Sequence, residues 1–212
     1  MTRIAYLTSQ YPATSHTFIR REVEALRRAG VDIATFSIRQ PSLGERSAPE
    51  NREAFETTTY IQPPRLIAAL RAHLACLLQH PLRYARTLVD ALRHRVPGIS
   101  ATLYSFIYFA EAIVLANAVR QQRITHLHNH FANAAAIVGY LATRFLGIEH
   151  SLTLHGISEF DYPAGLLLRE KLKHARFVAC ASHFCRAQAL RSTDPDDWSK
   201  MMIVRCGIDT ER

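Results

Sequence analysis

The chain has 212 residues and a mass of 24.0 kDa; 48% of its residues are hydrophobic and 21% are charged. This composition suffices for one substantial core and excludes a disordered chain, a collagen-like chain and a disulfide miniprotein. Lys and Arg number 26 against 18 Asp and Glu, and the net charge of +8 favours an acidic partner such as a phosphate, a nucleotide or an anionic membrane surface.

The first part of the chain predicts a βαβ unit. Residues 4–7 form an apolar, strand-like run, and the apolar positions from Phe18 to Ala29 recur at helical spacing before Gly30. Residues 31–38 are again typical of a strand. A strand, a helix and a strand at this spacing predict parallel strands joined by a right-handed crossover, and therefore an α/β fold.

The middle of the chain predicts a helical insertion over about residues 63–123. Residues 40–62 are polar and rich in proline, so we expect them to leave the sheet as an irregular segment. Three helical patterns follow, at residues 65–79, 81–95 and 100–123. The most apolar stretch, residues 103–119, is shorter than the roughly 20 residues that span a bilayer, which favours a buried helix.

After the insertion, strand and helix patterns alternate to the end of the chain. The predicted strands are residues 124–129, 149–154, 177–181 and 201–205, and the predicted helices are residues 131–145, 166–174 and 183–191. The whole pattern predicts about six strands in one Rossmann-like, doubly wound and mainly parallel sheet with helices on its faces.

The cysteines and the N-terminus indicate an intracellular protein. Cys76, Cys180, Cys185 and Cys206 form no C-x-x-C pair, which argues against a zinc ribbon or a thioredoxin-like site and favours reduced thiols. Residues 1–7 lack the long apolar segment and cleavage site of a secretory signal. We therefore expect a cytoplasmic protein.

The first candidate site is the hydroxyl-rich loop of residues 9–18. In a doubly wound sheet the functional groups follow the carboxyl ends of the strands. Ser15 and Thr17 stand where a helix begins, so they can either bind a phosphate or a sugar hydroxyl or simply cap the helix. Neither G-x-G-x-x-G nor a P-loop motif is present, which disfavours a dinucleotide or P-loop site.

The second candidate is a row of three histidines. His126, His128 and His130 alternate along one strand and share one of its faces. They are compatible with the metal site of a hydrolase barrel, but the chain that follows is too short for most of a barrel of about 250 residues. We therefore expect His126 and His128 to pack at the strand end and His130 to point into a cleft.

The third candidate follows the next strand. His155 stands at the carboxyl end of an apolar run, and Gly156 is expected to let the backbone turn beneath a ligand. Ser158, Glu159 and Asp161 lie close by in the same loop, although the acidic pair can equally cap the next helix. A binding role is the favoured interpretation for His155.

Four segments together resemble the N-terminal domain of glycosyltransferase family 4, whose retaining enzymes have the GT-B fold. They are Tyr11-Pro12-x-x-Ser15-x-Thr17-Phe18-Ile19-x-x-Glu22-Val23, His128-x-His130-Phe131-Ala132, Thr153-x-His155-Gly156 and Val204-Arg205-Cys206-Gly207-Ile208-Asp209. The likeness runs over nearly the whole chain and is nearest to bacterial enzymes that build exopolysaccharide or colanic-acid-type polymers. It departs at His16, where the family more often has Glu, so an acceptor contact from that side chain is in doubt.

The resemblance implies that residues 1–212 form the acceptor-binding half of a retaining enzyme that needs no metal ion or other cofactor. The nucleotide-sugar donor would bind mainly to a C-terminal domain absent from this chain, which alone would be inactive. The acceptor would be a glycan or a lipid-linked molecule in bacterial polysaccharide biosynthesis. His155 matches the family histidine that reaches the donor sugar, and the predicted substrate-binding residues are Ser15, Thr17, His130, Gly156, Ser158 and Glu159.

Two further questions stay open at this point. Residues 65–95 carry many basic side chains among leucines, which is typical either of a surface that lies on anionic lipid or of a solvated basic face over a leucine core. The chain could also be a non-catalytic glycan- or nucleotide-binding module. No helix-turn-helix, RNA-binding or zinc-finger pattern is present, so we expect no nucleic-acid partner.

Overall fold

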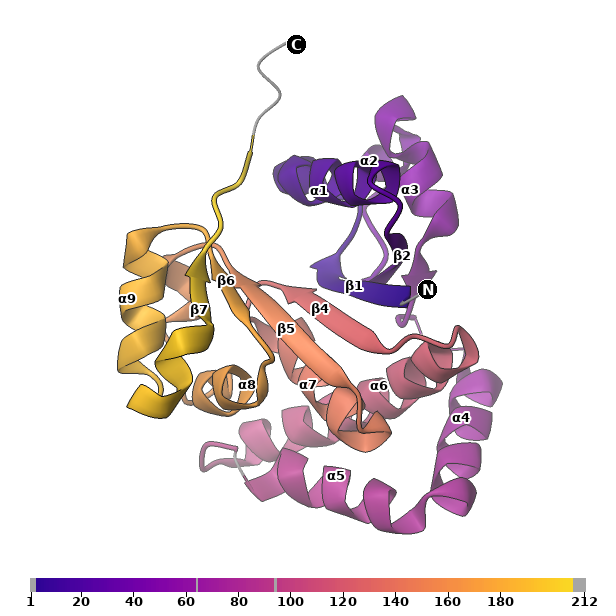
Figure 1. Ribbon diagram of the computed structural model, residues 1–212. Coiled ribbons are helices and arrows are strands. Elements are labelled where there is room, and N and C mark those ends of the chain that lie inside the picture. The colour runs from indigo at the N-terminus through magenta and orange to yellow at the C-terminus, as the bar shows by residue number, and fades with distance from the viewer. Residues whose placement is uncertain (1–2, 64, 94, 208–212) are drawn as a thin grey trace.

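The computed structural model describes residues 3–63, 65–93 and 95–207, which fold around one parallel sheet (Figure 1). Seven strands lie in the order β3-β2-β1-β4-β5-β6-β7, and every neighbouring pair is parallel. The strands are β1 (Arg3–Gln10), β2 (Asp32–Arg39), β3 (Thr59–Tyr60), β4 (His126–His130), β5 (Glu149–Leu154), β6 (Val178–Cys180) and β7 (Met201–Ile203). This confirms the Rossmann-like α/β fold.

The strand order explains where a ligand can bind. From β1 the chain builds the sheet in one direction through β2 and β3, then returns to the other side of β1 and continues from β4 to β7. The boundary between β1 and β4 is therefore a topological switch point, where the loops after neighbouring strands diverge and leave a crevice.

Apart from α2 and α3, the helices agree closely with the predicted ones. They are α1 (Thr17–Arg28), α2 (Leu43–Ser47), α3 (Arg52–Thr57), α4 (Leu66–Gln79), α5 (Pro81–Arg93), α6 (Ile99–Gln121), α7 (Ala134–Leu146), α8 (Leu168–His174) and α9 (His183–Arg191). Helix α7 begins at an Asn133 cap and ends at Gly147, whose φ of 72° places it in the left-handed region. Glycine adopts that conformation without the steric penalty of a side chain.

The segment of residues 40–62 differs from its prediction. It contains α2, α3 and the edge strand β3, so the sheet has seven strands where about six were expected. Strand β3 pairs with β2 through only Thr59 and Tyr60, a length at which no alternating pattern can be recognised.

The sheet carries its main core on the face covered by α6 and α7. That core joins side chains of β1 and β2, such as Leu7 and Phe36, to both helices. Helix α6 is long and apolar enough to cross a membrane; 33% of its apolar window is buried, and its buried part packs against α7. The predicted buried helix is confirmed for its second half, whereas Ile99 and Leu103 at its start are 83% and 60% exposed.

Helix α4 does not carry a leucine core. Its buried residues are Ala72 and Cys76, and Leu66, Ile67 and Leu78 are 70%, 68% and 72% exposed. The small side chains let α4 approach α6, and its larger apolar side chains remain on the outside. The leucine-core interpretation of residues 65–95 is therefore wrong for this helix; His94, from the same basic segment, lies outside the described residues.

Candidate active site

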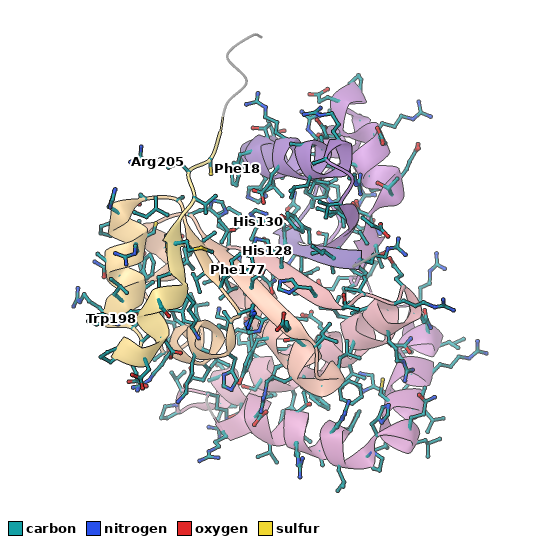
Figure 2. The ribbon with its side chains drawn as sticks, viewed as in Figure 1. Phe18, His128, His130, Phe177, Trp198 and Arg205 are labelled. Atoms are coloured by element: carbon teal, nitrogen blue, oxygen red, sulfur yellow. The ribbon has the colours of Figure 1, made fainter. Side chains whose placement is uncertain are left out.

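The loops after β1, β4 and β5 bring His155 into a group of aromatic rings at the switch point. The ring centroid of His155 lies 4.7 Å from that of Phe18, 4.5 Å from that of Phe131 and 5.4 Å from that of His130. Figure 2 shows Phe18, His130 and His128 between α1 and strands β4 to β6. Residues separated by more than 100 positions in the sequence thus form one enclosure around His155.

The enclosure keeps His155 in its neutral form. Burial, and to a smaller extent the nearby His16, lowers the pKa of His155 to about 4. A neutral imidazole has one nitrogen that donates a hydrogen bond and one that accepts. Nε2 of His155 lies 3.1 Å from Nδ1 of His130, and Nδ1 of His155 lies 3.7 Å from Sγ of the exposed Cys206. His155 is therefore a hydrogen-bonding group near neutral pH, and its positive charge is not available.

The histidines of β4 are held from the neighbouring strand. Ser151 Oγ lies 2.7 Å from His126 Nε2 and 2.7 Å from His128 Nδ1. Thr153 Oγ1 lies 2.9 Å from His128 Nε2. Burial lowers the pKa of His128 to about 3, so this ring is also neutral. His126 and His128 were expected to pack at the strand end; His128 is buried within β4, and His126 is half-buried at the first residue of that strand.

His130 does not point into an open cleft. Its side chain is fully buried, because the His155 ring stacks on it and Tyr6 lies against it with ring centroids 5.2 Å apart. The predicted exposure of His130 is therefore wrong. It reaches the cleft only through His155.

The group of residues that could hold a metal ion in the structure differs from the three histidines predicted. Among the described residues, ligand atoms of Glu22, His128 and His130 lie within 4.8 Å of one another, whereas His126 is not part of this group. Both nitrogens of His128 already have hydroxyl partners, and Tyr6 donates to Glu22. The three-histidine site expected for a hydrolase is not what the fold assembles.

A buried carboxylate connects the loops after β4 and β5. Glu159 is only 2% exposed and accepts hydrogen bonds from the backbone N–H groups of Ala132, of His155 at 2.6 Å and of Gly156 at 2.9 Å. Burial raises the pKa of Glu159, and these backbone bonds oppose the rise. Its carboxylate faces the protein and not the cleft, so its place in the fold is that of a residue that holds the His155 loop.

Lys171 completes this connection from α8. Its fully buried ammonium donates to the backbone carbonyls of Ala132 and of Asn133, the latter at 3.2 Å. Burial lowers the pKa of Lys171 to about 7, and the nearby Glu159 opposes the shift. Sequence reasoning missed this residue, although a lysine on the inward face of a helix with Leu168 and Leu172 is a recognisable signal.

The other predicted residues lie in the segments that follow β1 and β5. Ser15 and Ser158 are exposed and Thr17 is half-buried, and no side-chain cap bond is made at the start of α1, so simple capping does not account for these hydroxyls. The chain bends at Gly156, as expected, but the φ of Gly156 is −162°, an extended conformation open to any residue, so the bend does not depend on glycine. A Cβ on Gly156 would meet no atom within 4 Å, so the space beside its backbone is open.

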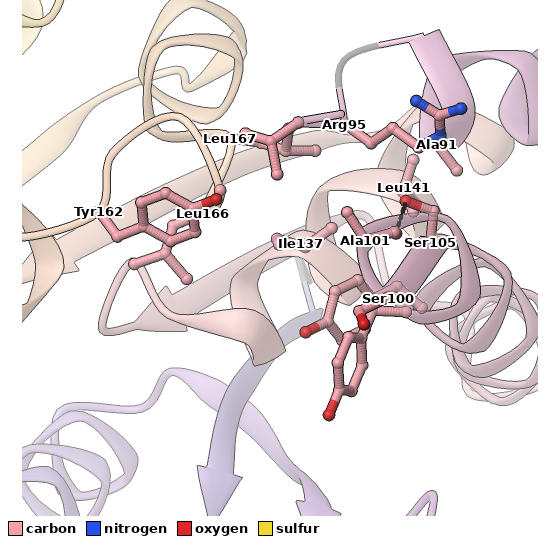
Figure 3. A pocket seen from close by; sticks show the side chains of 14 residues that line it. Ala91, Arg95, Ser100, Ala101, Ser105, Ile137, Leu141, Tyr162, Leu166 and Leu167 are labelled. Atoms are coloured by element: carbon pink, nitrogen blue, oxygen red, sulfur yellow. Dashed lines mark hydrogen bonds between the residues drawn. The ribbon is translucent and has the colours of Figure 1, made fainter. Parts of the chain in front are cut away.

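A separate apolar cavity of about 310 Å³ lies between α5, α6, α7 and the loop before α8 (Figure 3). Its walls include Tyr104, Ile137 and Leu167, with Arg95 at the edge. None of the histidines around His155 lines it. It is therefore distinct from the enclosure around His155.

Comparison with solved structures shows the same fold. The chain is similar to MurG of Acinetobacter baumannii, with a TM-score of 0.54 and 11% identity; the match covers 100% of this chain and 47% of that one. It is also similar to a glycosyltransferase of Rickettsia africae, with a TM-score of 0.52 and 14% identity; the match covers 99% of this chain and 44% of that one. A third similar structure is MnaA of S. aureus in a co-structure with UDP, with a TM-score of 0.56 and 10% identity; the match covers 96% of this chain and 43% of that one. The chain thus spans less than half of each of these proteins.

The sequence comparison is more specific. A search of curated proteins found no match. Residues 15–212 match the family model described as Glycosyltransferase Family 4, which covers the loops carrying Ser15, His130 and His155. The chain therefore belongs to glycosyltransferase family 4.

Proposed function

We propose that this chain is the acceptor-binding half of a retaining glycosyltransferase. The enzyme would transfer a sugar from a nucleotide-sugar donor to a glycan or lipid-linked acceptor in bacterial polysaccharide biosynthesis. The observation that carries the proposal is the neutral His155, held at the switch point between Phe18 and Phe131 in a family 4 chain. The similarity to a protein determined with UDP supports a nucleotide-linked donor.

Each part of the site has a place in this reaction. His155 would hydrogen-bond a hydroxyl of the donor sugar, and its aromatic neighbours would keep water away from it. The hydroxyls of Ser15, Thr17 and Ser158, which follow β1 and β5, would orient the acceptor. Following the resemblance to family 4, we propose transfer with retention assisted by the leaving phosphate, without a metal ion, and His155 in its neutral form would act as a hydrogen-bonding group.

The proposal is tested on the full-length protein that carries this chain. Purified protein is incubated with UDP-, GDP-, ADP- and dTDP-sugars, with and without EDTA, and release of the nucleoside diphosphate is measured. We expect one donor class to react, and His155→Ala to reduce turnover by much more than His126→Ala. Equal losses in the two variants would contradict the role of His155.

A product of inverted anomeric configuration, observed by NMR, would contradict retention, and loss of turnover in EDTA would contradict metal independence. Binding of a nucleotide or glycan without turnover of any donor would favour the alternative of a non-catalytic module.

We further propose that the chain is a cytoplasmic protein that lies peripherally on the inner face of the membrane, through residues 65–95 and the start of α6. The exposed apolar side chains of α4, α5 and α6 support this proposal; they are Leu66, Ile67, Leu70, Leu74, Leu77, Leu78, Leu82, Val89, Ile99, Leu103, Tyr104, Phe106 and Ile107. Figure 1 shows α4 and α5 together at the side of the molecule away from the C-terminal segment.

Basic residues accompany the apolar ones. The exposed basic residues are Arg65 just before α4, Arg71 on α4, and Arg83 and Arg86 on α5. Each basic residue near an anionic membrane contributes about 1 kcal/mol to binding. Vesicles of phosphatidylcholine with and without phosphatidylglycerol are floated with the protein. We expect flotation with the anionic vesicles, its loss in Arg65→Glu/Arg71→Glu, and no change in the matched control Arg28→Glu on α1. Equal flotation with both vesicles would contradict the proposal.

A further inference from the structure

A line of polar side chains leads from the interior to His155. Tyr6 OH donates to Glu22 Oε1 at 2.8 Å. The same carboxylate oxygen lies 3.7 Å from Nε2 of His130, and Nδ1 of His130 lies 3.1 Å from Nε2 of His155. The line comes from β1, α1, β4 and the end of β5, and it crosses the switch point.

Glu22 determines which atoms donate and which accept in the hydrogen bond between His130 and His155. Nε2 of His130 is fully buried and has no hydrogen-bond partner among the described residues, so its proton is best placed toward the carboxylate 3.7 Å away. A neutral imidazole carries its proton on one nitrogen only. With the proton on Nε2, Nδ1 of His130 is an acceptor, and the nitrogen facing it, Nε2 of His155, must be the donor.

We propose that Glu22 and His130 are positioning residues that hold His155 in its Nε2–H form and leave its Nδ1 unprotonated on the side of the exposed Cys206. His155 then accepts a hydrogen bond from a ligand hydroxyl and cannot donate one through Nδ1. This rests on the proposed function and deepens it, since it specifies that His155 accepts, and does not donate, in its hydrogen bond with the sugar hydroxyl. The tautomer itself does not depend on which reaction the protein catalyses.

The surroundings of Nδ1 agree with this assignment. The thiol of Cys206 lies 3.7 Å from Nδ1 of His155. Burial raises the pKa of this thiol, which keeps its proton in place near neutral pH. The S–H group can donate to an unprotonated Nδ1, so this contact is compatible with the Nε2–H form, although it does not by itself select that form, because a thiol sulfur also accepts.

The test measures the tautomer directly and needs no ligand. Protein labelled with ¹⁵N-histidine is studied by two-bond ¹H–¹⁵N correlation NMR at pH 7.5, with His155 and His130 assigned from single His→Gln variants. We expect a protonated Nε2 and an unprotonated Nδ1 for both residues. A His155 protonated on Nδ1 would overturn the proposal, whether or not the protein turns over a nucleotide sugar.

A variant tests whether Glu22 sets the tautomer. Glu22→Met keeps the length of the side chain and removes the acceptor, so we expect the Nδ1–H form of His155 to gain on the order of tenfold relative to the Nε2–H form. Glu24→Met, on the exposed side of the same helix, is the matched control and should change nothing. An unchanged tautomer in a folded Glu22→Met protein would show that Glu22 does not position His155. If this variant fails to fold, the spectrum of the wild-type protein still tests the tautomer of His155.

Discussion

Acidification from pH 7.5 to 5.5 is expected to destabilise this protein before most surface carboxylates begin to titrate. Burial lowers the pKa of His128 and His150 to about 3 and of His155 to about 4, and it lowers that of His130 well below its ordinary value. In the unfolded chain these histidines titrate near pH 6.5. Between pH 6.5 and about 4 the unfolded chain therefore binds more protons than the folded protein, and stability falls as the pH falls.

The size of the effect follows from the number of these histidines. Each one costs about 1.4 kcal/mol per pH unit below 6.5, so the four together cost about 5 kcal/mol on reaching pH 5.5. Glu22 and Glu159 act in the opposite direction, because burial raises their pKa and the folded state takes up protons there first. We expect a net loss of about 3–5 kcal/mol, a large part of a typical folding free energy of about 5–15 kcal/mol.

Urea denaturation followed by circular dichroism at pH 7.5, 6.5 and 5.5, at constant ionic strength, measures this loss as a change in unfolding free energy. The variant His150→Gln should reduce the pH dependence by about 1.4 kcal/mol per unit, because it removes one buried imidazole far from the cleft. The exposed His183→Gln is the control. An unfolding free energy that stays constant from pH 7.5 to 5.5, or an unchanged slope in His150→Gln, would refute the reasoning.

Two other substitutions test the packing around the site. Lys171→Met leaves the backbone carbonyls of Ala132 and Asn133 without their donor and removes a positive charge near the buried Glu159, so we expect a loss of about 3–5 kcal/mol in urea denaturation, with little change in the exposed Lys173→Met. Equal effects of the two would contradict a structural role of the buried ammonium. Gly139→Ala places a Cβ within 2.2 Å of the Asn129 side chain, whereas Gly44→Ala meets no atom within 4 Å. The first should cost about 1–3 kcal/mol and lower the melting temperature, and the second should not; a stable Gly139→Ala protein would show that Asn129 can move aside.

The order of strands and helices could be predicted from the sequence because it depends on local patterns of apolar and polar residues. Alternating and helical periodicities fix each element, and the rule that ligands bind at the carboxyl ends of parallel strands placed His155 at the correct edge of the sheet. The edge strand at Thr59 was missed because a two-residue strand has no period. The fold class and the position of the candidate site were thus properties of the sequence alone.

The contacts within the site were decided by the tertiary structure. Glu22, His130 and His155 meet only because β1, β4 and β5 lie side by side, and no local pattern reports that His155 covers His130. Lys171 is buried for the same reason, since its ammonium on α8 reaches backbone carbonyls in the distant loop after β4. The leucines of α4 are the converse case: their spacing suits a core, but a sequence records only that a face is apolar, and the packing of neighbouring helices decides whether that face is covered.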